Sequence, residues 1–130
     1  MKYCSECGSE TEKKIPEGDN RERDCCRSCG LIHYSNPKII VGTIPAKNKS
    51  VLLCKRAIEP RYGKWTLPGG FLENGETVAQ GAFRETFEET NTEVEMNELY
   101  AIFNVPQINQ VYMLYRANVV SNDYAPTSES

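Results

Sequence analysis

Residues 69–92 begin with glycines and end with acidic residues, and one helix is the simplest element that joins the two parts. A helix over residues 77–90 places Glu85, Glu88 and Glu89 at positions i, i+3 and i+4, on a single face. Like charges at these spacings destabilise a helix by a few tenths of a kcal/mol per pair, unless cations lie among them. The stretch therefore indicates either a divalent-metal site or an exposed acidic helix held by salt bridges.

The sequence marks both ends of this helix. Thr77 and Gln80 have the spacing of a capping box, so the helix should begin near Val78. At the other end, Asn91 tolerates the left-handed backbone of a helix C-cap. Gly81 lies inside the helix, where glycine costs up to about 1 kcal/mol relative to alanine. Its missing side chain is expected to leave room for a loop or a ligand on the acidic side.

The N-terminal part carries two Cys-x-x-Cys-Gly units. In each unit two thiolates can converge on one ion, while the glycine lets the backbone turn its amides toward sulfur. Two units supply four thiolates for a structural zinc ion, whereas a redox Cys-x-x-Cys normally occurs singly in a βαβ context. The predicted zinc ligands are Cys4, Cys7, Cys26 and Cys29. Cys25 is expected to be a spare thiol, and His33 an ordinary ribbon or linker residue.

The composition restricts the partners of this 130-residue chain. A net charge of −3 gives no overall basic field for nucleic acid. The arginines of the cysteine-rich part stand among acidic residues without interleaved aromatics, which also argues against nucleic acid. No apolar run approaches the roughly 18 residues of a membrane span, and the first residues do not form a signal peptide. We therefore expect a cytoplasmic protein without a membrane partner.

The remaining sequence predicts strands on both sides of the helix. Residues 38–46 and 50–56 have β-branched and apolar patterns that predict a hairpin. Residues 93–105 and 108–120 follow the helix, and the second of these should be a central strand covered on both faces near its start. Trp65 is expected to pack in the interior, with stacking on a ligand as the alternative.

The spacing of the charged residues resembles a known family. Gly70, five residues, Glu76, seven residues, Arg84-Glu85, two residues and Glu88-Glu89 match the signature of the Nudix hydrolases position for position, and the chain is identified as a member. Two residues depart from the pattern. Asn91 and Thr92 stand where the family usually has glycine and an aliphatic residue, and Thr92 affects local packing.

The resemblance extends over nearly the whole chain. A four-cysteine ribbon followed by Gly-Lys-Trp-Thr-Leu-Pro-Gly-Gly resembles the zinc-ribbon Nudix proteins that include plant FAD and ADP-ribose pyrophosphatases. The specificity run of the related NADH pyrophosphatases is missing, because residues 101–107 have a different sequence. The resemblance implies a zinc ribbon at 1–33 and a Nudix α/β/α sandwich with a mixed sheet at 34–130. The family fold usually continues with a further helix, so this domain is expected to be incomplete at its C-terminus.

The family relation implies that water hydrolyses the diphosphate of a nucleoside diphosphate linked to another group. FAD or ADP-ribose is the favoured substrate, with release of AMP, and Mg²⁺ or Mn²⁺ neutralises the diphosphate and acidifies the attacking water. Family members are often dimers, so a homodimer is one expected assembly. Two alternatives stay open: a nucleic-acid-binding or regulatory protein with an inactive Nudix scaffold, and a house-cleaning nucleoside triphosphatase.

The resemblance also assigns roles in catalysis. The expected Mg²⁺ or Mn²⁺ ligands are Glu85, Glu88, Glu89 and the backbone of Gly69. One of Glu88 and Glu89 is expected to activate water, Glu76 to be an auxiliary ligand or base, and Arg84 to orient a carboxylate. Glu129 falls where a further base often lies in this family.

The substrate-binding residues are expected in the loops and strand ends. Lys55 and Arg56 are candidates for phosphate contact, and their alternative role is a solvated strand end. Aromatic rings that could stack on adenine or flavin are Tyr62, Phe71 and Phe103.

Overall fold

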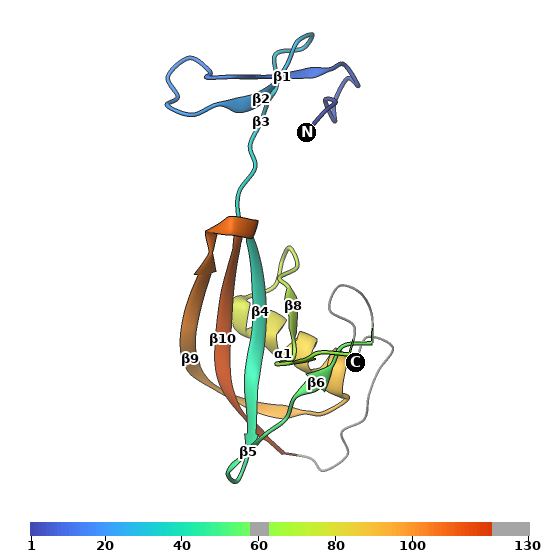
Figure 1. Cartoon of the computed structure of the whole chain (residues 1–130), viewed down its shortest axis with the longest axis vertical. Helices are drawn as coiled ribbons and strands as arrows, with labels where there is room; N and C mark the ends of the chain where they lie inside the picture. Colours follow the sequence, from blue (N-terminus) through green and yellow to red (C-terminus); the bar gives the residue numbers. More distant parts are fainter. Residues whose placement is uncertain (58–62, 121–130) are drawn as a thin grey trace. The chain divides into compact units, whose positions relative to one another are not determined.

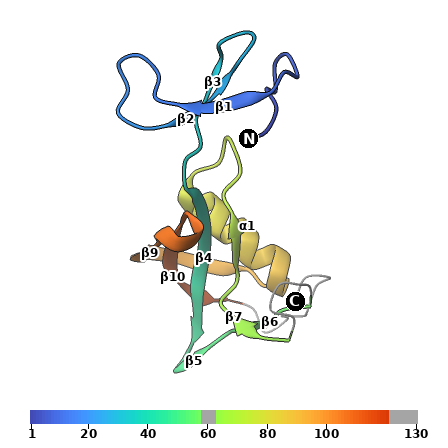
Figure 2. The same ribbon diagram turned by 45° about the horizontal axis from the view of Figure 1, so that its top comes forward.

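The computed structural model describes residues 1–57 and 63–120 (Figures 1 and 2). The chain divides into two compact units, Met1–Asn36 and Pro37–Ser130, and each is described by itself. Among the described residues, none of the helices has the length and apolar character needed to cross a membrane.

The first unit is a three-stranded antiparallel sheet in the order β1-β2-β3. Its strands are β1 (Thr11–Lys14), β2 (Arg23–Cys26) and β3 (Ile32–His33). Gly8 and Gly30, which follow the second cysteine of each Cys-x-x-Cys unit, have φ values of 77° and 76°. Only glycine adopts this backbone region without strain, so the two glycines turn the chain beside the cysteines.

The second unit is built on a mixed sheet in the order β5-β4-β10-β9, with β8 also paired to β4. Its strands are β4 (Lys38–Lys47), β5 (Ser50–Val51), β8 (Gly69–Phe71), β9 (Val94–Val105) and β10 (Gln110–Val119). The β4–β10 pair is parallel and the other pairs are antiparallel. A short 3₁₀ helix, η1 (Pro106–Ile108), connects β9 to β10, which run side by side with β4 in Figure 1. The predicted α/β fold with a mixed sheet is confirmed.

Helix α1 (Val78–Thr90) follows β8 and has the predicted ends. The Thr77 hydroxyl accepts a hydrogen bond from the Gln80 backbone N–H at 3.1 Å, and the Thr77 N–H donates to the Gln80 side chain at 2.9 Å. Asn91 forms the C-cap in the left-handed conformation, with φ of 54°. Both expectations are confirmed, because each cap depends only on residues close in sequence.

The helix packs on one face of the sheet, where Val41, Thr43 and Pro45 of β4 are fully buried. The buried hydroxyls of Thr43 and Thr86 lie 2.7 Å apart, and the Thr86 hydroxyl also donates to the Ala82 carbonyl at 2.8 Å. These contacts fix the helix against β4.

Thr92, the departure from the family pattern, is buried at the end of the helix. Its hydroxyl donates to the Thr90 carbonyl at 3.2 Å. A buried hydroxyl with a partner costs little free energy, so threonine is tolerated at this position.

Three expectations are wrong, one about strand pairing and two about burial. The predicted strand 50–56 divides into β5 and β6 (Cys54–Lys55), and β6 pairs with β7 (Trp65–Thr66) in a separate two-stranded sheet (Figure 2). Leu52 donates to the Pro45 carbonyl at 2.8 Å, but Pro45 has no N–H to return, so the β4–β5 ladder ends there.

The other two concern burial. Trp65 is 64% exposed, because a two-stranded sheet offers little cover. Strand β10 is central, as expected, but its first half is only half-buried and Ala117 near its end is its most buried residue. Helix α1 packs mainly on β4 and β8, and it therefore leaves much of β9 and β10 uncovered.

Candidate active site

Strand β8 approaches β4 and α1 closely because it is built from glycines. Gly69 pairs with Gly42 and Gly70 with Val41. A Cβ atom on Gly70 would overlap the carboxylate of Glu85, and a Cβ atom on Gly69 would lie 2.9 Å from the Val41 carbonyl oxygen. The missing side chain of Gly70 thus lets a helix carboxylate lie directly against the strand.

Arg84 lies at the centre of the acidic residues. Its Nε donates to Glu76 Oε2 at 3.0 Å and its Nη2 to Glu76 Oε1 at 2.7 Å, which is a two-pronged contact. Its Nη1 donates to Glu85 at 2.8 Å and to Glu88 at 3.2 Å, and its Nη2 also donates to the Phe71 carbonyl at 3.1 Å. One cation therefore joins the loop before α1, strand β8 and the acidic face of the helix.

This network sets the charges of its members. Arg84 first, and then the backbone N–H of Glu73, 2.8 Å from Glu76 Oε1, together lower the pKa of Glu76 to about 2. The same contact raises the pKa of Arg84. Glu76 and Arg84 are both ionised at neutral pH, so the loop is held to the helix by opposite charges.

The missing side chain of Gly81 lets the loop before α1 pack closely against the helix. A Cβ atom there would lie 2.8 Å from Glu76 Oε1, 2.8 Å from Leu72 Cδ1 and 3.0 Å from Val41 Cγ2. The expectation that the missing side chain leaves room for a loop is confirmed.

Glu89 faces the start of β8. Its Oε2 accepts a hydrogen bond from the Gly69 N–H at 3.2 Å. Burial and the charge of Glu89 together raise the pKa of Cys54 to about 11. The thiol of Cys54 is therefore protonated at neutral pH and is no nucleophile there.

The glutamates offer hard oxygen ligands, which suit Mg²⁺ or Mn²⁺. Glu85 is buried against β8, Glu89 binds the β8 backbone, and the Glu88 side chain is 53% exposed. In the described part of the chain, however, only the four cysteines bring three or more ligand atoms within 4.8 Å of one another. Glu85 and Glu88 each direct one carboxylate oxygen at Arg84, so a metal ion among the glutamates would compete with Arg84 for these oxygens.

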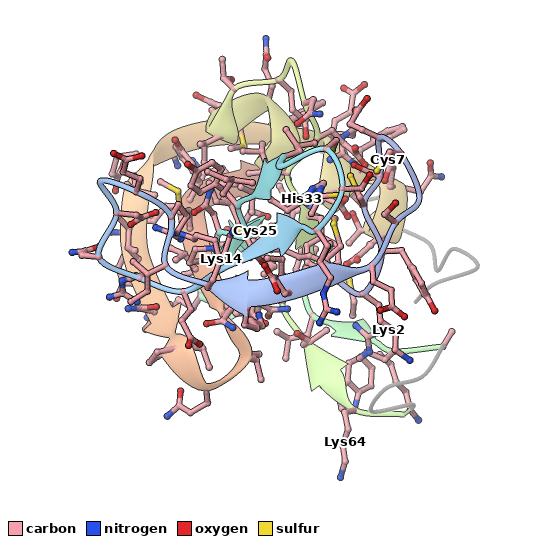
Figure 3. All side chains as sticks on the ribbon, turned by 90° about the horizontal axis from the view of Figure 1, so that it is seen from above. Lys2, Cys7, Lys14, Cys25, His33 and Lys64 are labelled. Atoms are coloured by element: carbon pink, nitrogen blue, oxygen red, sulfur yellow. The ribbon has the colours of Figure 1, made fainter. Side chains whose placement is uncertain are left out.

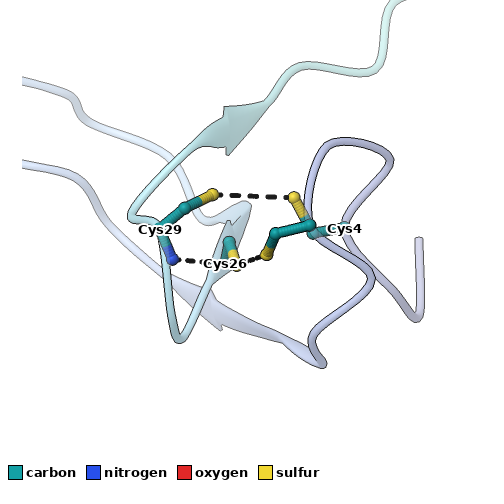
Figure 4. Close-up of side chains that lie close together, drawn as sticks. Cys4, Cys26 and Cys29 are labelled. Carbon is teal, nitrogen blue, oxygen red and sulfur yellow. Dashed lines mark hydrogen bonds between the residues drawn. The ribbon is translucent and has the colours of Figure 1, made fainter.

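The cysteine group forms a second candidate metal centre (Figure 4). The Sγ atoms of Cys4 and Cys29 lie 3.8 Å apart and those of Cys7 and Cys26 3.4 Å apart. A tetrahedral site with Zn–S bonds of about 2.3 Å needs sulfurs about 3.8 Å apart, so the spacing suits zinc. Hydrogen bonds from Ser9, its backbone N–H first, lower the pKa of Cys7 to about 6, which favours the thiolate that binds metal.

The other sulfur of this unit lies apart. Cys25 is buried on β2 and its Sγ lies near the Arg23 and Lys14 carbonyl oxygens, at 3.7 Å and 3.9 Å. The metal-ligand group does not include it.

Two of the predicted stacking rings, Phe71 and Phe103, lie far apart on the sheet. The pairing register places Phe71, Ile40, Tyr112 and Phe103 in one row across four strands, on the sheet face opposite α1. Three strand spacings separate the rings of Phe71 and Phe103, about 14 Å, so the two rings cannot sandwich one base. Lys55 lies over Trp65, with its Nζ atom 5.9 Å from the ring centroid.

Arg56 exchanges backbone hydrogen bonds with residues of the loop that follows it. Its N–H donates to the Lys64 carbonyl and its carbonyl accepts from Gly63, both at 2.9 Å. Tyr62 and Glu129, also predicted as site residues, lie outside the described residues.

Sequence reasoning missed two contacts. Lys38 lies over Phe71, with its Nζ atom 5.2 Å from the ring centroid, and no local pattern marks it. His33, expected to be an ordinary ribbon or linker residue rather than a ligand, is not in the metal-ligand group, but its Nε2 atom lies 3.3 Å from Cys4 Sγ. The signal that could have identified it is its position, four residues after the last cysteine of the second unit.

Comparison with known proteins also divides the chain into two parts, one for each of these two sites. A family model described as the NUDIX domain matches residues 37–130, and one described as Nudix N-terminal matches residues 2–35. The crystal structure of a NUDIX hydrolase from Nitrosomonas europaea superposes with a TM-score of 0.95 at 58% identity, covering 100% of this chain and 74% of that one.

Two curated relatives are more distant. An ADP-ribose pyrophosphatase of Methanocaldococcus jannaschii is 38% identical over 56% of this chain and 43% of its own length. The NAD-capped RNA hydrolase NudC of Pseudomonas aeruginosa is 29% identical over 98% of this chain and 44% of its own length. The chain thus spans less than half the length of these two relatives.

Proposed function

Because the chain belongs to the Nudix family, with a ribbon of the Nudix N-terminal type, we propose that it is a metal-dependent pyrophosphohydrolase. It cleaves the diphosphate of a nucleoside diphosphate linked to another group, with ADP-ribose or FAD as the favoured substrate. The observation that carries the proposal is the pair of helix carboxylates, Glu85 and Glu89, held against the glycines of β8.

The helix carboxylates suit the metal that this reaction needs. Glu85, Glu88 and Glu89 would hold Mg²⁺ or Mn²⁺, with the Gly69 backbone next to Glu89. A bound divalent ion would neutralise the diphosphate and lower the pKa of the attacking water. Glu85 and Glu89 are held against β8, which fixes the direction of their oxygens before an ion arrives.

The proton of the attacking water needs an acceptor at the surface of the site. Glu88 is exposed, whereas Glu89 is half-buried and accepts a hydrogen bond from the Gly69 N–H, which favours Glu88 for this role. Water adds to one phosphorus, the bridging P–O bond breaks, and Glu88 takes the proton of the water. Arg84 stays on Glu76 through its two-pronged contact, so the loop before α1 keeps its position during the reaction.

One of the relatives supports the choice of ADP-ribose as substrate. The relative in Methanocaldococcus jannaschii is named an ADP-ribose pyrophosphatase, and hydrolysis of ADP-ribose would release AMP and ribose 5-phosphate. Since Phe71 and Phe103 lie too far apart to stack on the same base, we propose that Phe71 alone stacks on it. The backbone carbonyl of Phe71 binds Arg84, so Phe71 lies next to the carboxylates at the edge of the sheet although its ring faces away from α1, whereas Phe103 lies three strands away. Lys38, over the Phe71 ring, and Lys55 supply cations for phosphate.

The four cysteines would hold zinc in a structural site. Four sulfur ligands close the tetrahedron and leave no position for substrate, so this ion would take no part in hydrolysis. The soft sulfurs and the hard carboxylates select different ions, and the two sites can be loaded separately.

One assay tests the proposed function. The full chain with Mg²⁺ or Mn²⁺ is incubated separately with ADP-ribose, FAD, NADH, a NAD-capped oligoribonucleotide and deoxynucleoside triphosphates, and the products are separated by chromatography. We expect AMP from ADP-ribose or FAD, and release slower by about 100-fold or more from the folded Glu88→Gln variant. Hydrolysis of the triphosphates alone would favour the house-cleaning alternative, and no product from any substrate would favour the binding alternative.

A further inference from the structure

His33 lies at the cysteine centre, although it belongs to neither Cys-x-x-Cys unit. It is the last residue of β3 and pairs with Asp24 of β2, the strand that also carries Cys25 (Figure 3). This pairing brings its Nε2 atom to 3.3 Å from Cys4 Sγ, across 29 residues of sequence. The contact therefore depends on the fold of the ribbon.

The four thiolates of such a centre carry more negative charge than one zinc ion neutralises, and N–H donors to sulfur offset the excess. Cys26, which is buried, receives two backbone N–H groups, from Ser28 and Cys29, both at 3.3 Å. Cys4 is equally buried, but Glu6 is the one described backbone donor to its sulfur, at 3.4 Å. The imidazole of His33 stands where the second donor to Cys4 is needed.

The geometry favours a hydrogen bond over direct ligation by His33. The four sulfurs already lie within 4.8 Å of one another and supply the four corners of a tetrahedron. Metal ligands commonly depend on such outer partners, and removal of one partner typically costs about 10- to 100-fold in metal affinity.

We propose that His33 is a positioning residue of the cysteine centre, which donates Nε2–H to the Cys4 thiolate and so increases the affinity of the site for zinc. This proposal rests on zinc as the ion of the ribbon, and it is independent of hydrolytic activity. The hydrogen bond requires a proton on Nε2.

The test compares zinc affinity among three variants of the full chain by competition with a chromophoric chelator. His33→Phe keeps a ring but removes the donor, and we expect its affinity to fall about 10- to 100-fold. His33→Gln restores an N–H donor, and we expect it to recover part of the loss. Ser28→Ala is the matched control, because its side chain is exposed and its backbone N–H remains.

Cobalt substitution distinguishes donation from ligation. We expect wild type and His33→Phe to share the same visible spectrum, since both keep four thiolates. A shifted ligand-field band in His33→Phe would show that His33 is a ligand and would overturn the proposal. An unchanged zinc affinity in His33→Phe, or a loss that His33→Gln does not recover at all, would also overturn it. A purified wild-type chain without zinc would remove its premise, whatever the hydrolase assay gives.

Discussion

Replacement of Gly81 by alanine should separate stability from activity. Alanine gains up to about 1 kcal/mol in helix propensity over glycine. Its Cβ atom would lie 2.8 Å from both Glu76 Oε1 and Leu72 Cδ1, and 3.0 Å from Val41 Cγ2. Glu76 and Leu72 can move because these atoms end flexible side chains, whereas Val41 is fully buried. An overpacked site typically costs about 1–3 kcal/mol, so we expect a net loss of about 0–2 kcal/mol.

The loss in kcat/KM should exceed what the small change in unfolding free energy would suggest, because the displaced Glu76 oxygen accepts two hydrogen bonds. Glu76 Oε1 accepts from Arg84 Nη2 at 2.7 Å and from the Glu73 N–H at 2.8 Å. A charge-assisted hydrogen bond contributes about 1.5–3 kcal/mol, so weakening this contact predicts a loss of about 10- to 100-fold in kcat/KM. Urea unfolding gives the stability, and AMP release from the best substrate gives the activity.

A double-mutant cycle shows whether the effect passes through Glu76. Glu76→Gln and Gly81→Ala are measured singly and together. If Gly81→Ala acts by displacing Glu76, the alanine should cost little further activity in the Glu76→Gln background. Full additivity of the two losses, or wild-type kcat/KM in Gly81→Ala, would refute the reasoning.

Three further predictions follow from the same contacts. Glu88→Gln should lower kcat by about 100- to 10,000-fold and leave the circular dichroism spectrum unchanged, since Glu88 is exposed and is proposed to accept the proton. The pKa of Glu76 is lowered from 4.5 to about 2, so its stabilisation is complete above pH 4.5 and is lost as the pH falls toward 2. The difference in unfolding free energy between wild type and Glu76→Gln should therefore shrink over that range, and a constant difference would contradict it. Gly42→Ala should destabilise the chain by at least about 2 kcal/mol in urea unfolding, because its Cβ atom would overlap the Pro68 carbonyl oxygen, which is backbone.

The features that the sequence predicts well are local. The capping box of Thr77 and Gln80 and the left-handed Asn91 each depend on neighbours within one turn, so the ends of α1 are predicted to the residue. The Arg84–Glu88 contact of 3.2 Å is local in the same sense, because the two residues lie one helical turn apart.

The features that it misses depend on distant partners. The end of the β4–β5 ladder depends on where Pro45 falls in the register, and the separation of Phe71 from Phe103 depends on the strand order. The contact of His33 with Cys4 likewise requires the pairing of β2 with β3. Residue type alone does not specify these pairings. It also does not decide whether the glutamates form a metal site or a salt-bridged helix, because that depends on how the loop and β8 pack against α1.

The buried contact between Thr43 and Thr86 sets the rotation of α1 about its own axis. The Thr86 hydroxyl has one proton and gives it to the Ala82 carbonyl, so Thr43 must be the donor to Thr86. Thr43→Val then leaves no polar atom without a partner, whereas Thr86→Val leaves the Thr43 proton buried without an acceptor, at about 1–3 kcal/mol. Since Glu85 is the residue next to Thr86, the bond also aims its carboxylate at Gly70.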